Sequence, residues 1–376
     1  MTSPPLSGVR VVEIGNYMSV PFAGMMLADL GAEVVKVEPP KGDPFRRFGR
    51  PKGPMAAVFV NANRGKQSVV LDLKQENDRA QLCALLRDTD VVISNWRPGV
   101  AARLGLGDDA LAEINPRLIR VYVSGYGSTG PDSDKPSYDS VVQARSGLTW
   151  AQGGDGEPTL AVGYLVDKMT ATMAAQATIA ALYRRSVTDE GDAIEVPMLD
   201  VMAYLNFPEI FANRTFVDDE PLDSRNRQMM ANHPLQALDG WILLSPVSAD
   251  QIRDAFAAVD HPEWADAVFS EKDGAAMTRL LVERIESQTR SLTVAECLAR
   301  FDARDVPVGQ CVDLDQHLVD EQVVHNELYE IVDHPQLGRV RQVRYPARSL
   351  QWGALCGRAI APLLDADRQQ ILGEGR

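Results

Sequence analysis

One acidic side chain lies just before a long helical segment. Asp167 falls in the string GYLVDKMTA, ahead of residues 168–185, which are rich in Ala and Met and predict a buried helix. Asp is a favoured helix N-cap, and capping alone would explain this residue. The helix dipole and backbone N–H donors also favour an ionised carboxylate there, which in a dry site is the form that attacks a thioester. Asp167 is therefore a candidate cap and a candidate nucleophile.

Basic side chains gather in several predicted loops, although the chain as a whole is acidic, with a formal net charge of -14. That balance argues against binding of nucleic acid, which needs a basic face. A ligand with several phosphates would need local Arg and Lys, although a solvated surface also explains such clusters. The clusters are Arg46, Arg47 and Arg50, then Arg64 and Lys66 in NRGK, and Arg97 and Arg103 in NWRPGVAARLG.

Other catalytic patterns find little support. None of the five histidines lies in the first two hundred residues and there is no GxSxG elbow, which argues against a His-activated serine in that region. No HExxH or CxxC spacing indicates a metal site, so we expect no metal. The loop after the first strand, GNYMSV, lacks the GxGxxG glycines of a dinucleotide site, although Glu38 ends the second strand where a ribose-binding acid would lie.

Alternating strands and helices must position these residues. Apolar, β-branched runs predict strands at 9–14, 33–38, 68–73, 90–94, 118–124 and 191–199, with helices at 21–30, 75–87 and 168–185. Such alternation implies a parallel sheet covered by helices on both faces. The Gly/Pro-rich loop at 125–136 follows a strand, where ligands of open α/β sheets bind. The fold class is therefore α/β, with a Rossmann-like sheet domain.

The second half of the chain has a different pattern. Residues 205–230 lose periodicity, which indicates a linker. A hairpin with an Asp239-Gly240 turn is expected at 236–245, before helices near 249–259, 275–286 and 293–303. These segments predict a small α+β domain at 231–325. Strand-like pieces at 338–345 leave the fold of the tail undecided.

The sequence also bears on location. The first residues, MTSPPLSGVR, lack a basic region followed by an apolar run, and no stretch approaches the ~18 apolar residues that span a membrane. The four cysteines are scattered, which fits a reducing compartment. We therefore expect a cytoplasmic protein with no membrane segment.

Six stretches, read together, resemble the class III CoA-transferase family, which includes formyl-CoA transferase, carnitine CoA-transferase and α-methylacyl-CoA racemase. They cover roughly the first two hundred residues in order, and the later half resembles the family less clearly. The stretches are GVRVVEIGNYMSVPFAGMMLADLGAEVVKVEPPKGD, NRGKQSVVLDLK, NWRPGVAARLG, INPRLIRVYVSGYGSTGP, KPSYDSVVQARSGL and GYLVDKMTA.

The resemblance implies a particular architecture. The family has a sheet domain built from both chain ends, a small domain joined by long linkers, and two chains interlocked as rings. By this comparison residues 1–204 and 326–376 form the large CoA-binding domain, 205–230 the linker and 231–325 the small domain of an interlocked homodimer.

The resemblance also implies an activity, the transfer of coenzyme A between an acyl-CoA and a carboxylic acid. Asp167 matches the family's nucleophile, which forms a mixed anhydride and then an aspartyl-CoA thioester without ATP. Arg103 and Lys135 match positions that hold CoA phosphates, and Arg64, Lys66 and Arg97 are expected to help on charge grounds.

Two further positions bear on the reaction and the substrate. Tyr138 matches the transferases, whereas racemases carry a His there that moves the α-proton, and a Tyr with a pKa near 10 is a poor base for that step. The resemblance thus favours a transferase over a racemase-type isomerase or a non-catalytic CoA-binding protein. Met18 stands where formyl-CoA transferase has a Gln near the substrate, which predicts a larger or less polar acyl group.

Overall fold

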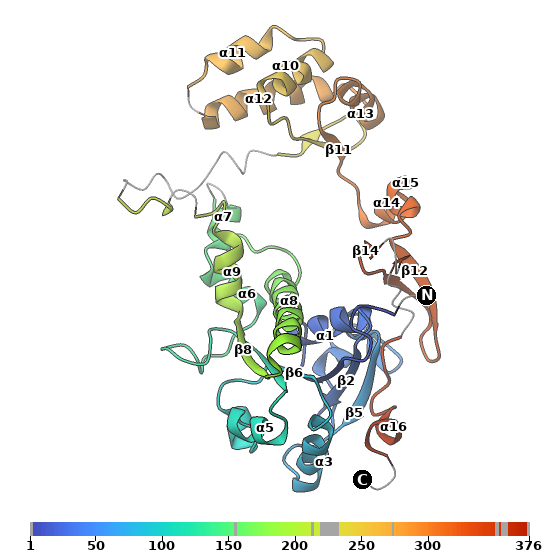
Figure 1. The fold of residues 1–376 in the computed structure, drawn as a ribbon. Helices are drawn as coiled ribbons and strands as arrows, with labels where there is room; N and C mark the ends of the chain where they lie inside the picture. Colours follow the sequence, from blue (N-terminus) through green and yellow to red (C-terminus); the bar gives the residue numbers. More distant parts are fainter. Residues whose placement is uncertain are drawn as a thin grey trace. The chain divides into compact units, whose positions relative to one another are not determined.

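The computed structural model divides the chain into two compact units, each with its own core (Figure 1). The structure describes residues 3–153, 156–211, 214–218, 233–272, 274–349, 353–354 and 360–373. The first, called the sheet unit, comprises Met1–Leu148, Leu160–Asn206 and Glu327–Arg376, and the second, called the small unit, comprises Thr149–Thr159 and Phe207–Asn326. Residues 149–159 thus group with the small unit, whereas the sequence assigned them to the large domain. Part of the predicted linker at 205–230 lies outside the described residues.

Six parallel strands form the main sheet, in the order β5-β2-β1-β6-β7-β8. They are β1 (Arg10–Ile14), β2 (Glu33–Glu38), β5 (Lys66–Val70), β6 (Val91–Ser94), β7 (Ile119–Ser124) and β8 (Asp192–Pro197). The chain winds outward from β1 to β5 and then restarts at β6 on the other side of β1. This confirms the predicted parallel α/β sheet and places its switch point, where the loops diverge, between β1 and β6.

The two faces of the sheet differ in polarity. One face carries Val12, Val37 and Val69, which pack with Leu82 of helix α3 (Glu76–Leu86) in an apolar core. The other face is covered by α1 (Ser19–Asp29), α2 (Ala57–Asn63) and α8 (Leu165–Thr188) and contains buried charged residues. They are Glu13, Lys36, Glu38 and Lys66. Helix α1 approaches this face closely, since a Cβ at Gly24 would collide with the Glu13 carboxylate.

Helix α8 was predicted to be buried on most sides, but it is buried on one face. That face consists mainly of small side chains, such as Ala171, Ala174 and Thr178. The other face carries exposed Ile179 and Tyr183, with 39% and 74% of their surface accessible. Small residues let α8 pack closely against α1, and the apolar residues beyond them lack cover within the described chain.

Three shorter helices complete the region around the carboxyl ends of the strands. They are α4 (Val100–Arg103), α6 (Asp139–Arg145) and α9 (Met198–Asn206), while α5 (Asp108–Ile114) precedes β7.

The small unit has the predicted α+β character. A three-stranded antiparallel sheet combines β9 (Leu235–Gln236), β10 (Trp241–Leu244) and β11 (Val308–Gln310). The main helices are α10 (Ala249–Ala258), α11 (Trp264–Ser270), α12 (Gly274–Thr289) and α13 (Val294–Asp302). Phe256 and Phe301 are fully buried in its core.

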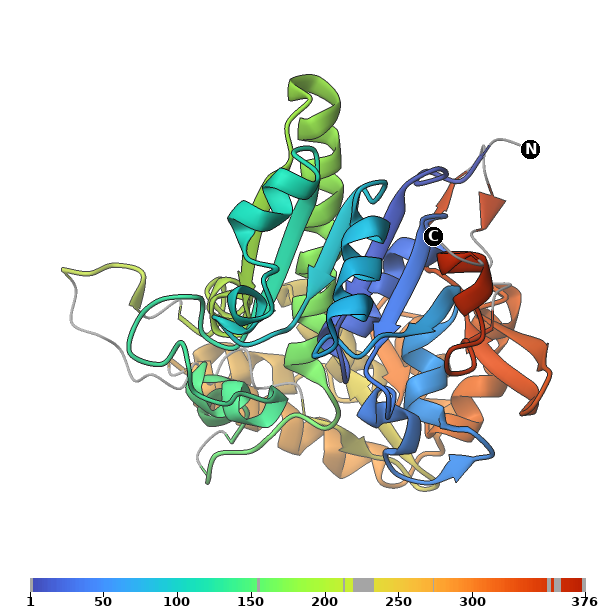
Figure 2. The same cartoon turned by 90° about the horizontal axis from the view of Figure 1, so that it is seen from below.

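The tail, whose fold the sequence left undecided, returns to the sheet unit. A hairpin of β12 (Tyr329–His334) and β13 (Gly338–Val343) comes first. Residues 365–367 then run along the edge strand β5, where Figure 2 shows the red C-terminal helix. The carboxylates of Asp367 and Asp365 accept hydrogen bonds from the N–H groups of Ser68 and Val70, at 2.8 and 2.7 Å. Side-chain oxygens therefore satisfy donors that an uncovered edge strand would expose.

A buried ion pair joins α1 to the segment after α2. The Arg64 guanidinium donates two hydrogen bonds to the Asp29 carboxylate, at 2.9 and 2.5 Å, and both residues are buried. Removing one partner of a buried pair leaves the other charge uncompensated, whereas replacing both with apolar groups is often tolerated.

We therefore expect Arg64→Ala to lower the free energy of unfolding by about 3–5 kcal/mol, measured by urea titration. The double variant Asp29→Leu/Arg64→Met should recover most of that loss. A double variant as unstable as the single one would show that the pair does not act as this geometry indicates.

Candidate active site

A cavity of about 300 Å³ opens at the carboxyl end of the parallel sheet, beside its switch point. Its walls come from the loops after β1, β6 and β7, together with the first turns of α8 and α9. The polar, charged and aromatic residues that line it are Asn16, Tyr17, Ser19, Asn95, Trp96, Arg97, Ser124, Ser133, Lys135, Ser137, Tyr138 and Asp167. The structure thus brings together four of the residues singled out from the sequence, namely Asp167, Tyr138, Arg97 and Lys135.

Asp167 lines this cavity from the first turn of α8, but it is not the helix cap. The N-cap residue is Tyr164, whose side chain makes no capping hydrogen bond. The backbone N–H of Asp167 instead donates to the Asp139 carboxylate at 3.0 Å. Because Asp139 satisfies this helix-end donor, the side chain of Asp167 remains available to the cavity, where Ser19 hydrogen-bonds to it.

Asp139 is a site residue that the sequence argument quoted only as part of a motif. It is the first residue of α6 and is buried, with a hydrogen bond of 2.6 Å from the Gln143 amide. Gln143 in turn accepts the N–H of Ala161 at 2.9 Å, which ties the segment before α8 to α6. In the sequence, only its position directly after Tyr138 could have singled out Asp139. Its hydrogen bond to α8 is evident only from the fold.

Burial and the neighbouring Asp139 carboxylate raise the pKa of Asp167 to about 7, and the hydrogen bond from Ser19 opposes them only in part. The position at a helix end predicts an ionised carboxylate. Desolvation by burial is the largest cause of the shift and the Asp139 charge adds to it, so the pKa rises instead. Asp167 is therefore a poorly solvated carboxylate close to half ionisation at neutral pH, as a general base or nucleophile at that pH requires.

Two tyrosines stand at the same cavity. The rings of Tyr17 and Tyr138 meet edge to face with centroids 5.9 Å apart, and burial is the largest of several causes that raise the pKa of Tyr17. Tyr17 has φ of 67°, a left-handed conformation that is uncommon for a bulky residue and costs on the order of 1–2 kcal/mol. Sequence reasoning missed Tyr17, because nothing in its type indicates a strained backbone.

The expected phosphate-binding residues divide into two groups. Arg97 and Lys135 are exposed and line the main cavity, where Lys135 also pairs with Asp132. Arg103 lines a neighbouring cavity of about 320 Å³ with Lys74 and the apolar Leu73 and Leu104. Asn16 and Trp96 line both cavities, so the two cavities adjoin and their four basic residues lie in one region.

The structure places Arg64 and Lys66 differently from the expectation that they contact CoA phosphates. Arg64 is committed to Asp29, as described above, and the Lys66 ammonium lies 2.7 Å from the Glu13 carboxylate and donates to the carbonyl of Pro21. Both side chains are buried and neither lines the two cavities described above. Their charges balance buried carboxylates, which a string such as NRGK does not reveal.

Met18 also lies away from the substrate position that the sequence predicts for it. Its side chain is buried in an apolar cluster with Phe45 and Phe59 and lines neither cavity. The turn at residue 17 directs Tyr17 and Ser19 to the cavity and Met18 into the core. The larger or less polar acyl group predicted from Met18 therefore has no support at this position.

The described residues contain no group of three or more His, Cys, Asp or Glu side chains placed to hold a metal ion. Among the helices of the same residues, none has the length and apolar character needed to cross a membrane.

The raised pKa of Asp167 leads to a pH-dependent prediction. Between the ordinary pKa near 4 and about 7, the folded chain keeps a proton on this carboxyl that the unfolded chain has released, so wild-type stability falls as pH rises. Asp167→Asn buries no charge, so its free energy of unfolding should exceed the wild-type value above pH 7, by at most about 4 kcal/mol, and approach it below pH 4.

Urea titrations across this pH range check the expectation. Asp139→Asn removes the second carboxylate charge. In that background, the difference in the free energy of unfolding between proteins with and without Asp167→Asn should be smaller. A gap that stays constant with pH would contradict a pKa near 7 for Asp167.

Comparison with known proteins now adds to this geometry. The chain matches the model of CoA-transferase family III over residues 6–368. An acetyl-CoA:oxalate CoA-transferase of Acetobacter aceti is 35% identical over 316 residues, which are 82% of this chain and 81% of that protein. A succinyl-CoA–D-citramalate CoA-transferase of Chloroflexus aurantiacus is 31% identical over 353 residues, covering 90% of this chain and 86% of that protein.

A solved structure agrees with these sequence relatives. The crystal structure of a CAIB/BAIF family protein from Brucella suis has a TM-score of 0.85 to this chain at 26% identity, covering 98% of this chain and 100% of that chain. The family model spans the sheet unit and the small unit, so the match is not confined to the N-terminal stretches on which the resemblance was based. The chain therefore belongs to CoA-transferase family III.

Proposed function

We propose that this protein is an acyl-CoA:carboxylate CoA-transferase that works through a covalent intermediate on Asp167. The observation that carries the proposal is a half-buried carboxylate at the cavity that is not used as a helix cap and whose pKa is raised to about 7. Membership of the family and the names of the relatives, which are CoA-transferases with different acids, support the same reaction class.

The reaction follows from a carboxylate nucleophile. An Asp167 oxygen attacks the carbonyl carbon of the acyl-CoA and the C–S bond breaks. CoA departs as the thiolate, and the acyl group and Asp167 form a mixed anhydride. The thiolate then attacks the Asp167 carbonyl of that anhydride, which releases the first carboxylic acid and leaves an aspartyl-CoA thioester. An incoming carboxylate repeats the two exchanges in reverse, so the thioester energy is conserved and Asp167 is regenerated.

Neighbouring groups of this chain have defined roles in these steps. Ser19 orients the Asp167 carboxylate, and Asp139 holds the helix turn that carries it. Because burial and Asp139 destabilise the ionised carboxylate, its negative charge is relieved when it becomes an acyl anhydride. Tyr17 and Tyr138 form the wall beside which the acyl group or the acceptor acid would lie.

The coenzyme A substrate fits the two adjoining cavities. Arg97 and Lys135 would hold phosphates near Asp167, while Arg103 and Lys74 would do so at the second cavity. The apolar walls of that second cavity, including Leu73 and Leu104, suit a flat base. These local cations allow an acidic chain to bind a polyanion.

We further propose an interlocked homodimer that acts in the cytoplasm. Exposed apolar side chains on α8 and α9, including Ile179, Tyr183 and Tyr204, support burial against a second chain. Free cysteines within the described part of the chain support a reducing location.

The nucleophile is tested by exchange of isotope-labelled CoA between acyl-CoAs and free carboxylic acids. We expect Asp167→Ala to lower exchange by at least about 1000-fold, because no other carboxylate replaces the missing bond-forming oxygen. Asp134→Ala, an exposed acid of the nearby loop, serves as the matched control and should keep its activity.

Trapping with hydroxylamine during turnover should place the label on the peptide that contains Asp167. Exchange that survives in Asp167→Ala would refute this nucleophile. Absence of exchange with any pair, together with α-proton exchange into deuterated water, would favour a racemase-type isomerase instead.

Binding of coenzyme A gives a second test. Arg103→Ala and Lys135→Ala should each weaken CoA binding about tenfold in calorimetric titrations, because each removes a charge-assisted contact to phosphate. Arg87→Ala removes an exposed charge outside both cavities and should leave the affinity within about twofold. Equal losses in all three variants would indicate general charge attraction rather than these sites.

A further inference from the structure

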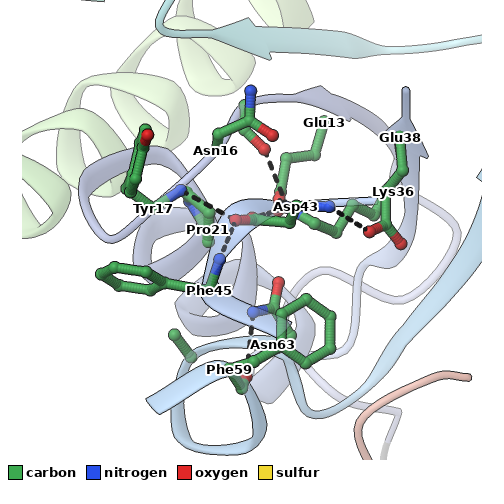
Figure 3. Close-up of polar contacts among 12 residues, drawn as sticks. Glu13, Asn16, Tyr17, Pro21, Lys36, Glu38, Asp43, Phe45, Phe59 and Asn63 are labelled. Carbon is green, nitrogen blue, oxygen red and sulfur yellow. Dashed lines mark hydrogen bonds and ion pairs between the residues drawn. The ribbon is translucent and has the colours of Figure 1, made fainter. Parts of the chain in front are cut away.

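Four buried charged residues lie in contact with one another and take no part in the proposed chemistry. Figure 3 labels three of them, Glu13, Lys36 and Asp43. Lys36 lies 2.7 Å from a Glu13 carboxylate oxygen and 2.9 Å from an Asp43 carboxylate oxygen. Lys66 lies 2.7 Å from the other Glu13 oxygen. Glu13, Lys36 and Lys66 have side chains without solvent exposure, and Asp43 is likewise buried. We call these four residues the charge cluster.

The cluster holds the loop that follows β1. The Lys36 ammonium donates to the carbonyl of Gly15 at 2.8 Å. The Asp43 carboxylate accepts the N–H of Tyr17 at 3.2 Å, a bond that Figure 3 shows reaching across from the neighbouring loop. Asn95, after β6, accepts the N–H of Asn16 and donates to its carbonyl. Successive peptide groups at 15–17 are therefore fixed from two sides.

These bonds surround the left-handed Tyr17. A strained backbone persists only where its surroundings determine it, and here Asp43 and Asn95 bind the groups on its N-terminal side. A glycine at position 17 would adopt this conformation freely. A tyrosine there places its ring against Tyr138 and Phe45, with centroid distances of 5.9 and 5.4 Å. The left-handed conformation of Tyr17 therefore places its ring at the cavity.

We propose that Asp43, oriented by Lys36, is a positioning residue for CoA transfer: its bond to the Tyr17 N–H keeps the Tyr17 ring against Tyr138 beside Asp167. The proposal rests on the proposed function. The Lys36 ammonium lies 2.9 Å from the Asp43 carboxylate and orients it, and the Glu13 carboxylate in turn holds Lys36 at 2.7 Å. Asp43 lines neither of the two cavities of the candidate site, so it acts through Tyr17.

A double-mutant cycle tests this relay. Asp43→Asn keeps the size of the side chain and removes its charge, while Tyr17→Gly removes the ring and keeps the left-handed backbone. We expect Asp43→Asn to lower kcat about tenfold with KM for acyl-CoA unchanged, because the phosphate contacts are untouched. In the Tyr17→Gly background the same substitution should lower kcat less than twofold.

A general structural role gives a different result. If Asp43 only stabilises the fold, Asp43→Asn will have the same effect on kcat with and without the Tyr17 ring, and that outcome overturns the proposal. If Asp43→Asn does not fold, Tyr17→Gly alone decides the role of the ring: wild-type stability or better with a tenfold lower kcat supports it, and unchanged kcat overturns it.

A readout independent of turnover separates this proposal from the proposed function. With 3-fluorotyrosine at position 17, Asp43→Asn should shift or broaden the fluorine resonance, whereas the exposed Asp134→Asn should not. An unchanged resonance in Asp43→Asn overturns the relay even where CoA exchange is normal. Absence of CoA exchange in the wild-type protein counts against the transferase and leaves the fluorine result to decide whether Asp43 holds Tyr17.

Discussion

The hydrogen bond from the Asp167 N–H to the Asp139 carboxylate determines much of the candidate site. It joins the start of α6 to the start of α8, so that two helices from different parts of the chain share one capping interaction. It also leaves the Asp167 carboxylate free for the cavity while placing a second negative charge beside it. A cap with a neutral Ser or Asn would satisfy the same donor but would not raise the pKa of Asp167 in this way.

Charge placement follows from the same need to satisfy buried groups. The face of the sheet under α1 has Glu13 opposite Lys36 in the β1–β2 register, and Lys66 on the next strand completes the pairing. Burial lowers the pKa of Lys66 to about 8, which reflects how little solvation this face provides. Cations on the sheet face therefore pair with buried carboxylates. Cations beyond the strands, such as Arg97 on a loop and Arg103 at the end of α4, line the cavities instead.

This division explains what the sequence could and could not predict. Strand and helix periodicity identified β1, β2, α3 and the hairpin of the small unit, because those patterns are local. The string GYLVDKMTA located Asp167 and the resemblance predicted a role for it, whereas its raised pKa comes from burial and from Asp139, which is 28 residues away. Arg64 and Arg103 are alike as residue types, and only tertiary packing against Asp29 separates a structural cation from one that lines a cavity.

Tyr17 and Asp167 bring two kinds of instability to one cavity, backbone strain and a poorly solvated charge. The strain at Tyr17 costs on the order of 1–2 kcal/mol and the Asp167 charge at most about 4 kcal/mol above pH 7, against a net stability of about 5–15 kcal/mol for a typical domain. Both persist because the groups around them are satisfied, with Asn95 and Asp43 on the loop and Asp139 on the helix turn. Relaxing either residue would stabilise the chain, so the surrounding bonds are as much a part of the candidate site as the groups that line the cavity.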